Sequence, residues 1–478
     1  MKDAVDRRAN EPADWRTMST TVSNGPGPAN GTPGPRGNPV LGSMRDFQRD
    51  KLGFIRSLTR YGDVARYRMA HLTWYQVNHP EGIRRVLQEN NRNYGKGSLT
   101  LGIFKPVVGE GLLTSEGGLW LRQRRLMQPV FHRRSVAAFG SLMTEETLAM
   151  LERWQPALQN GTTLDVPAEM ARLTLNIATA SLFHAHVGEE PGVISRAVNT
   201  LVEDLGYRFE VPFYPPPRVP TPRNRRLRAA LRTVDRAVYG IIAERRRGGG
   251  EEDDLLALLM GARDEQTGEA MNDRQLRDEV ITLFLAGHET TATALSWAFY
   301  LLATNPEAER RLRAELDEVL GTDGGRRVPT LGDLPRLAYT KMVVDETLRL
   351  YPPAWITNRQ AIAEDEILGH RIPAGAFVML SPYLLHRHPD YWERPDAFEP
   401  ERFAPGRDNG RPRFAYFPFG GGPRQCIGQS MALVEAQLVL ATVLGRCRLR
   451  PASDEPVEAE ALATLRPRGG LPMTVEPA

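Results

Sequence analysis

The sequence predicts a mainly α-helical protein with smaller β-sheets. Apolar residues recur with helical spacing from about residue 80 to about residue 350. Short strand-like runs precede this region at 64–68 and 74–77. After Pro352 the chain returns to short strands and loops, with one last helix from about Gly428 to Gly445. The 478 residues are enough to bury a large core and still enclose a cavity.

Composition separates the N-terminus from the rest of the chain. Residues 1–32 are rich in Pro, Gly, Asn and Ser and are predicted to be disordered, whereas 33–478 are predicted to form a single domain. Within that domain, the Pro-rich break from Val211 to Pro222 predicts a surface loop. Gly248 to Gly250 predict a turn.

Net charge and cysteine content exclude several classes of protein. The formal net charge of +3 gives no sign of nucleic-acid binding. Two cysteines, Cys426 and Cys447, are too few for a disulfide scaffold and suit a reducing compartment. No segment approaches about 18 consecutive apolar residues, and the charged N-terminus lacks the apolar core of a signal peptide. We therefore expect a cytoplasmic protein without a membrane span.

Arginine clusters are the marked feature of the charge pattern. They lie at Arg122, Arg124 and Arg125, at Arg133 and Arg134, at Arg225, Arg226 and Arg228, and at Arg245 to Arg247. Each cluster is interpreted either as the solvated face of a helix or as a docking surface for an acidic partner. The sequence leaves both interpretations open.

The segment from Asn272 to Thr304 predicts a long, buried helix. Asn272 can cap its first turn together with Gln275 three residues later. From 281 to 302 the segment is apolar nearly all round, which is typical of a helix inside the core. The polar run 288–291 interrupts this pattern directly after Gly287, and such a break in a buried helix indicates a functional site.

Cys426 stands in a glycine-rich segment suited to holding a thiolate. Phe419 to Gly428 read Phe-Gly-Gly-Gly-Pro-Arg-Gln-Cys-Ile-Gly. The glycines allow a tight loop that brings backbone N–H groups near the sulfur, and such donors stabilise a metal-binding thiolate. Arg424 can meet an anionic group of a cofactor. A glycine-rich turn with an incidental buried cysteine is the structural alternative.

This segment resembles the haem-binding loop of the cytochrome P450 family. Every fixed position of the pattern Phe-x-x-Gly-x-Arg-x-Cys-x-Gly is present, and the resemblance extends from about residue 33 to 474. It implies the P450 fold, a triangular prism with a helical domain and a β-rich domain. It also implies haem b, an iron protoporphyrin IX, with Cys426 as the metal ligand. A thiolate ligand favours cleavage of the O–O bond of dioxygen.

The run from Ala286 to Thr291 is similar to the oxygen-activating segment of the family's central helix. Gly287 leaves room beside the haem, with Ala286 next to it. Thr290 can bond back to the carbonyl of Ala286 and bend the helix. The resemblance implies that Glu289 and Thr290 are catalytic and relay protons to dioxygen.

Further haem contacts follow from the same resemblance. Trp120 and Arg124 match the family's Trp-x-x-x-Arg, and Arg359 lies where many members contact a propionate. With Arg424, this supplies three guanidiniums for two carboxylates. The full set of expected haem-binding residues is Trp120, Arg124, Ala286, Gly287, Arg359, Phe419, Gly420, Arg424, Cys426 and Gly428.

Glu346 and Arg349 are similar to the family's Glu-x-x-Arg pair, and their spacing places both charges on one helix face. Arg402 matches the third member of this structural triad. We expect all three to stabilise the fold rather than to act in catalysis. His386 and Cys447 are likewise expected to be structural.

The resemblance also implies which residues line a substrate pocket. They are Leu112, Leu113, Phe284, Leu285, Thr290, Ala354, Trp355, Ile356, Ala463 and Thr464. Because these are mostly apolar, we expect a lipophilic substrate such as a terpenoid, a fatty-acyl chain or a macrolide-like ring.

The predicted activity is monooxygenation, by hydroxylation or epoxidation, with electrons from NAD(P)H. Because the sequence contains no fused flavin or iron–sulfur domain, we expect a separate ferredoxin or flavodoxin with its reductase, and a monomeric enzyme. An H₂O₂-driven peroxygenase is an alternative, although such members typically lack the acid-alcohol pair that Glu289 and Thr290 form here. A non-enzymatic haem sensor or carrier would need neither a proton relay nor a roomy pocket.

Overall fold

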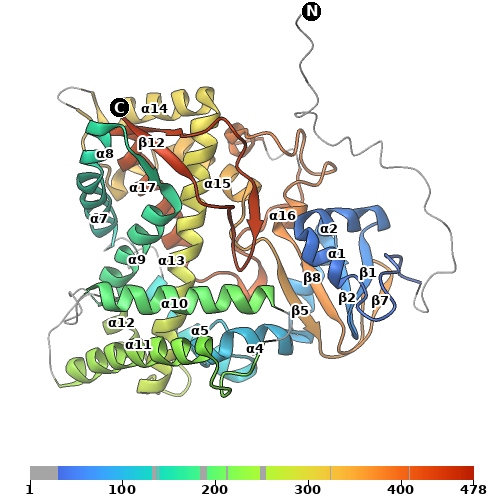
Figure 1. The fold of residues 1–478 in the computed structure, drawn as a ribbon. Helices are drawn as coiled ribbons and strands as arrows, with labels where there is room; N and C mark the ends of the chain where they lie inside the picture. Colours follow the sequence, from blue (N-terminus) through green and yellow to red (C-terminus); the bar gives the residue numbers. More distant parts are fainter. Residues whose placement is uncertain are drawn as a thin grey trace, which may run out of the picture.

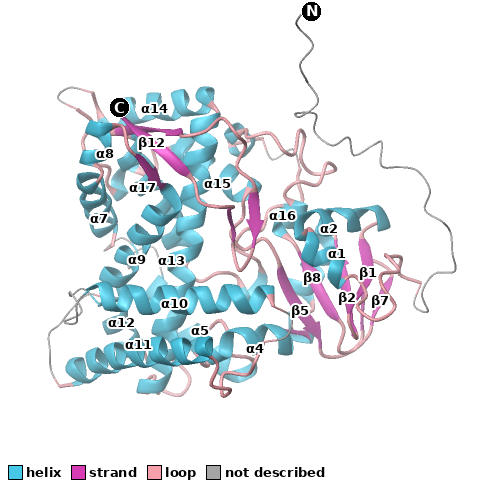
Figure 2. Ribbon diagram, in the orientation of Figure 1, coloured by secondary structure: helices cyan, strands magenta, loops and turns pink. Residues whose placement is uncertain are grey.

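The computed structural model describes residues 31–131, 136, 139–183, 191–211, 214–247, 254–322, 325–407 and 410–478. Most of these residues are helical, and the strands form small sheets, so the predicted fold class is confirmed. Figure 2 shows most of the helices gathered on one side and the largest sheet, with α1 and α2 beside it, on the other. Residues 1–30 of the predicted disordered segment and the predicted turn at Gly248 to Gly250 lie outside the described residues.

The helices differ widely in length, from short turns to one that crosses the molecule. They are α1 (Met44–Arg49), α2 (Lys51–Ser57), α3 (Pro80–Arg84), α4 (Gly97–Val108), α5 (Gly117–Met127), α7 (Gly140–Arg153), α8 (Gln155–Asn160), α9 (Val166–Phe183), α10 (Pro191–Glu210), α11 (Pro222–Arg246), α12 (Leu255–Gly261), α13 (Asp273–Thr304), α14 (Pro306–Leu320), α15 (Ala338–Leu350), α16 (Pro382–Leu385) and α17 (Gln429–Leu444). Helix α10 ends and α11 begins where the Pro-rich break predicted, and α17 matches the predicted last helix.

Among the described residues, four small sheets contain the strands β1 (Val64–Met69), β2 (Leu72–Val77), β3 (Tyr94–Gly95), β4 (Thr163–Asp165), β5 (Thr357–Ala361), β6 (Asp365–Ile367), β7 (His370–Ile372), β8 (Phe377–Leu380), β9 (Cys447–Pro451), β10 (Ala459–Ala461), β11 (Leu465–Pro467) and β12 (Pro472–Pro477). The largest sheet has the order β1-β2-β8-β5-β3. Only the β2–β8 pair in it is parallel. Helices α1 and α2 lie beside this sheet (Figure 1). The other sheets are the pairs β6-β7 and β10-β11 and the order β4-β12-β9.

Helix α13 runs through the middle of the helical part (Figure 1). Its start is set by a complete capping box. The Asn272 side chain accepts from the Gln275 backbone, and the Gln275 side chain accepts from the Asn272 backbone. Most of its residues are buried, as its apolar sequence predicts. This helix therefore provides a fixed support for any side chain that breaks the apolar pattern.

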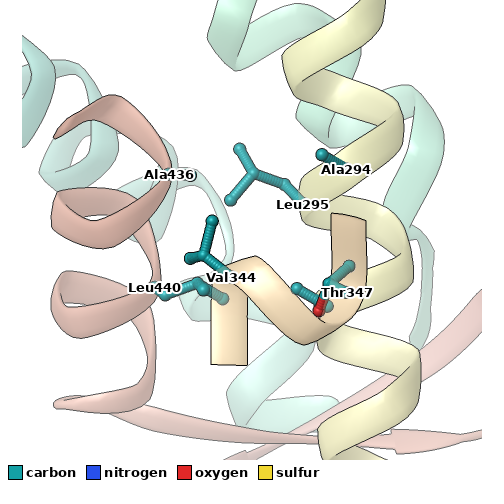
Figure 3. Close-up of a pocket in the computed structure, with 7 residues that line it drawn as sticks. Ala294, Leu295, Val344, Thr347, Ala436 and Leu440 are labelled. Atoms are coloured by element: carbon teal, nitrogen blue, oxygen red, sulfur yellow. The ribbon is translucent and has the colours of Figure 1, made fainter. Parts of the chain in front are cut away.

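The core beside α13 is closely packed. Helices α13, α15 and α17 enclose a small apolar cavity of about 10 Å³, the space of roughly one water molecule. Figure 3 shows its lining, which includes Leu295 of α13, Val344 of α15 and Leu440 of α17. Neither Cys426 nor Thr290 lines it, so it is a packing defect in the core and not the predicted reaction site.

Candidate active site

The loop that carries Cys426 joins a 3₁₀ turn, η8 (Gly422–Arg424), to the start of α17. The backbone N–H of Cys426 donates to the Phe419 carbonyl at 3.0 Å, which closes the loop. Gly422 has a φ of +67°, and a Cβ there would lie 1.8 Å from the Leu87 carbonyl oxygen. A side chain at this position would therefore force the loop away from the segment Arg85–Glu89.

The Cys426 thiol combines accessibility with desolvation. Its side chain is exposed, yet desolvation raises the pKa of the thiol above its ordinary value. These two properties together indicate a side chain that faces a space inside the protein. The backbone N–H groups of Gly428 and Gln429 and the charge of Arg124 lower the pKa of the thiol. The loop thus supplies the donors that a thiolate ligand requires.

Two of the predicted guanidiniums border this loop. Arg124 of α5 donates to the Gln425 carbonyl at 2.8 Å. Arg424 donates to the Ser115 carbonyl at 3.1 Å and stacks over the Trp120 ring, 4.3 Å from its centre. Trp120, Arg124 and Arg424 are therefore brought together around the Cys426 loop. Both guanidinium pKa values are lowered, chiefly because burial desolvates the cations.

A third guanidinium, Arg359 of β5, joins this cluster together with two residues that the sequence does not single out. Arg359 is only 8% exposed and lies near Arg424, Lys96 and Glu116. Desolvation, followed by the charges of Arg359 and Arg424, lowers the pKa of Lys96 to about 7, while Glu116 opposes this shift. Lys96 and Glu116 immediately precede α4 and α5, and no short motif marks either residue.

This cluster fits a ligand with carboxylate groups. In the described part of the chain, none of Lys96, Arg124, Arg359 and Arg424 forms an ion pair with an acidic side chain. Desolvated cations are costly unless anions balance them, and four cations beside the carboxylate of Glu116 therefore favour an anionic ligand. The two carboxylates of a haem would meet these cations while Cys426 reaches its iron. The residues present therefore fit the cofactor that the sequence resemblance implies.

Helix α13 has an accessible patch in its otherwise buried middle. Ala286 and Gly287 are exposed, although the neighbouring Phe284 and His288 are buried. A Cβ added to Gly287 would meet nothing within 4 Å. The Thr290 hydroxyl donates to the Ala286 carbonyl at 2.7 Å, which confirms the predicted bond back along the helix.

Glu289 lies on the same helix and contacts the C-terminal part of the chain. Its Oε1 accepts a hydrogen bond of 2.8 Å from the hydroxyl of Thr464, which follows β10. Desolvation raises the pKa of Glu289, while the Thr464 hydrogen bond and the charge of Arg466 lower it. A raised pKa makes this carboxyl group a better proton donor than an exposed glutamate.

The predicted pocket residues occupy two kinds of environment. Phe284 and Trp355 belong to the apolar core, and the Trp355 indole donates to the Leu462 carbonyl at 2.9 Å. Ala354 is exposed, whereas Thr464 is buried. The remaining members, Leu112, Leu113, Leu285, Thr290, Ile356 and Ala463, are half-buried.

Glu346, Arg349 and Arg402 form a closed network. Arg349 Nε and Nη2 donate to the two Glu346 oxygens at 2.6 and 2.8 Å, and both side chains are 0% exposed. The other Arg349 N–H groups donate to the carbonyls of His386, Pro395 and Ala397. Arg402 Nε lies 3.4 Å from Glu346 Oε1. This arrangement satisfies every N–H group of Arg349.

His386 and Cys447 lie in fully buried positions. His386 Nε2 accepts from the Phe417 backbone N–H at 2.9 Å, and desolvation lowers the pKa of the imidazole well below its ordinary value. Desolvation raises the pKa of the Cys447 thiol to about 12. Neither group has the surroundings of a reactive centre.

The arginines beside Arg124 have partners within the chain. Arg125 pairs with the fully buried Asp264 at 2.8 Å, and Arg122 pairs with Glu269 at 3.2 Å. These ion pairs fasten the loop before α13 to α5. They leave little free charge at Arg122 and Arg125 for docking an acidic partner. Arg133 and Arg134 lie outside the described residues.

Known proteins resemble this chain over nearly its whole length. The family model Cytochrome P450 matches residues 32–472. The chain is 38% identical over 443 residues to cyclooctat-9-en-7-ol 5-monooxygenase of Streptomyces melanosporofaciens, covering 92% of this chain and 94% of that protein. It is 36% identical over 428 residues to pentalenene oxygenase of Streptomyces avermitilis, covering 89% and 93%.

The fold also matches a solved structure. The crystal structure of the cytochrome P450DA haem domain aligns with a TM-score of 0.83 and 26% identity, covering 94% of this chain and 98% of that one. None of the described helices is long and apolar enough to cross a membrane. The family match, the two relatives and this fold agree with the site described above. The chain belongs to the cytochrome P450 family and is a haem-dependent monooxygenase.

Proposed function

We propose that this enzyme inserts one oxygen atom from O₂ into a terpenoid, by hydroxylation or epoxidation. The observation that carries this proposal is its similarity, over about nine tenths of its length, to enzymes named for oxidising an alkenol and an alkene. The predicted pocket residues agree with an uncharged, lipophilic substrate, because none of them carries a charge. Terpenoids fit both observations better than fatty acids, whose carboxylate would need a cationic partner.

Two groups of residues in this chain would hold the haem. Cys426 would be the iron ligand; desolvation raises the pKa of its thiol, while the N–H groups of Gly428 and Gln429 and the charge of Arg124 favour the anionic sulfur. When bound, the haem supplies the oxidising chemistry that splits O₂ and transfers one of its atoms. The exposed backbone at Gly287 leaves space for the cofactor and the gas beside α13.

The haem carboxylates would be bound by the basic cluster. Arg124, Arg359 and Arg424 provide the guanidiniums, Trp120 supports Arg424, and Lys96 adds a fourth cation. Glu116 offsets one of these charges. The bound carboxylates would replace the missing acidic partners and raise the pKa of Lys96 from about 7.

Proton delivery is assigned to Glu289 and Thr290. Glu289 holds a proton more readily than an exposed glutamate because desolvation raises the pKa of its carboxyl. The Thr290 hydroxyl, now donating to Ala286, can exchange that bond for one to a water molecule or to O₂. The second oxygen atom would leave as water after these proton transfers.

Electrons come from NAD(P)H through a separate ferredoxin or flavodoxin and its reductase. The partner would approach the face near Cys426. Because Arg122 and Arg125 already have acidic partners, we place less weight on them as docking charges.

The function is tested in two measurements on the purified haem protein. With CO, the reduced protein should show the red-shifted Soret band of thiolate ligation, and Cys426→Ser should lose that band. A screen of terpenoids, fatty acids and macrolides should give a low-to-high-spin shift with terpenoids, followed by NAD(P)H-dependent oxygenated products with a ferredoxin and its reductase. Shifts and products with fatty acids alone would overturn the substrate class. Equal turnover with H₂O₂ alone would favour a peroxygenase.

A further inference from the structure

The turn between β10 and β11 connects the predicted pocket with the predicted proton donor. Ala463, at its tip, is half-buried and is predicted to face the substrate, and Thr464 follows it. The Thr464 side chain is turned to α13, where its hydroxyl donates to Glu289 Oε1 at 2.8 Å. Thr464 itself is only 5% exposed, so this hydrogen bond is shielded from bulk water.

The turn is held rigidly by indole and ammonium groups. The Trp297 indole, two turns beyond Glu289 on α13, donates to the Leu465 carbonyl at 2.7 Å. The Trp355 indole donates to the Leu462 carbonyl, and the Lys51 ammonium donates to the Ala461 carbonyl at 2.7 Å. Since α13 and the turn are joined at both Glu289 and Trp297, the Thr464 hydroxyl has a fixed position relative to the helix.

The two oxygens of Glu289 are placed in different surroundings by this contact. Oε1 accepts from Thr464, whereas Oε2 has no hydrogen-bond partner within the described residues. An oxygen that already accepts a hydrogen bond is the weaker site for a proton. The exchangeable proton of the carboxyl group therefore belongs on Oε2, which remains available to water.

We propose that Thr464 is a positioning residue that fixes the Glu289 carboxyl and presents its Oε2 for proton delivery. This inference rests on the proposed role of Glu289. A carboxyl group held in one orientation keeps its Oε2 directed at the site of proton delivery, and this limits the release of peroxide.

The charged and titratable neighbours of Glu289 give the sign of the expected effect. Desolvation raises the pKa of Glu289, and the Thr464 hydroxyl and Arg466 are the groups that lower it. His288, the adjacent residue, faces away into the core, and desolvation lowers the pKa of its imidazole to about 4, so it is neutral near pH 7. Removing the Thr464 hydroxyl should therefore raise the pKa of Glu289.

The experiment compares four variants of the haem-loaded protein. Thr464→Val removes the hydroxyl with little change in shape, and Thr464→Ser retains it. Thr304→Val is the matched control, because its hydroxyl donates to the Tyr300 carbonyl near the end of the same helix. Glu289→Gln identifies the Glu289 band in infrared pH titrations of the ferric protein. The second readout is peroxide released per NADPH oxidised, with a terpenoid that gives a spin shift and a ferredoxin with its reductase.

We expect Thr464→Val to raise the Glu289 titration midpoint by about one pH unit, a tenfold change in protonation equilibrium. It should also release more peroxide, and Thr464→Ser should restore both properties. Thr304→Val should match the unaltered protein, and thermal unfolding should be similar for all four. If Glu289→Gln increases peroxide release but Thr464→Val changes neither readout, the role of Thr464 is overturned alone. If Glu289→Gln has no effect on peroxide, the proposed proton relay fails, and the role of Thr464 fails with it.

Discussion

Two groups of buried arginines in this protein have opposite surroundings. Arg349 is 0% exposed, and all its N–H groups have partners, including both oxygens of Glu346. Arg359 is 8% exposed but donates only to the Thr357 hydroxyl and the Asn358 carbonyl, and desolvation, followed by repulsion from Arg424, lowers its pKa to about 10. The chain itself satisfies the hydrogen bonds and the charge of Arg349. Those of Arg359 need an anionic ligand.

This difference distinguishes arginines that stabilise the fold from arginines that bind a ligand. A buried ion pair with all hydrogen bonds made holds the chain in one conformation. A cluster of cations that outnumber the acidic groups beside them destabilises the folded protein until a ligand supplies further negative charge. The Arg349 network and the Arg359 cluster should therefore respond in opposite ways when an arginine is replaced by a methionine of similar length.

The largest effect is expected in the Arg349 network. Arg349→Met leaves the Glu346 carboxylate buried, with Arg402 as its remaining, more distant cation. Loss of one partner of a buried pair costs about 3–5 kcal/mol. Urea unfolding followed by circular dichroism should show this loss in both the haem-loaded and the haem-depleted protein. A loss below about 1 kcal/mol would mean that the network contributes no more to stability than an exposed ion pair does.

Arg359→Met should have its effect on the cofactor. Because the guanidinium has no acidic partner in the described chain, its removal should leave the haem-depleted protein as stable as before, or more stable. Losing a charge-assisted hydrogen bond to a haem carboxylate should speed haem transfer to excess apomyoglobin by about tenfold or more. Destabilisation of the haem-depleted protein with unchanged haem transfer would reverse the assignment of Arg359.

The sequence predicts those parts of the fold and site that depend on local signals. Helix α13 begins and ends as predicted because Asn272 and Gln275 form a local capping box and its apolar pattern continues to Thr304. The Cys426 loop also depends on local signals, because the Cys426 N–H closes it onto the Phe419 carbonyl and Gly422 adopts a φ of +67°.

Contacts between distant segments are the part that the sequence does not predict. Lys96 and Glu116 join Arg424 only in the folded chain, where the Arg424 bond to Ser115 spans 309 residues. Glu289 and Thr464 are each predicted as site residues, but the hydrogen bond between them spans 175 residues and follows from no motif. Side-chain pairing of this kind depends on tertiary packing.

Lys96, which lies in the cluster with Arg359, should make the free energy of unfolding depend on pH. In the folded, haem-depleted protein, desolvation first, and then Arg359 and Arg424, lower the pKa of Lys96 from 10.5 to about 7. Between these pH values the unfolded chain binds a proton that the folded chain does not. The free energy of unfolding therefore rises with pH in this window and falls as pH is lowered towards 7.

Lys96→Met should remove this contribution, so the urea midpoint of the haem-depleted variant should rise less steeply between pH 7 and pH 9 than that of the unaltered protein. Bound haem should also flatten the dependence, because its carboxylates restore the charged form of Lys96. Equal slopes with and without Lys96 would mean that this ammonium group is well solvated.

The smallest effect on stability is expected for Glu307, an exposed residue that has the same three-residue spacing to an arginine as Glu346 has to Arg349. Glu307 pairs with Arg310 three residues later and with Arg311 four residues later, but all three side chains are at least half exposed. Water solvates these charges after one partner is removed, so Glu307→Gln should change the urea midpoint by no more than experimental error. The same three-residue spacing would then differ in effect only because of burial. A loss as large as that of Arg349→Met would mean that the spacing on the helix, and not burial, determines how much the pair contributes to the stability of the protein.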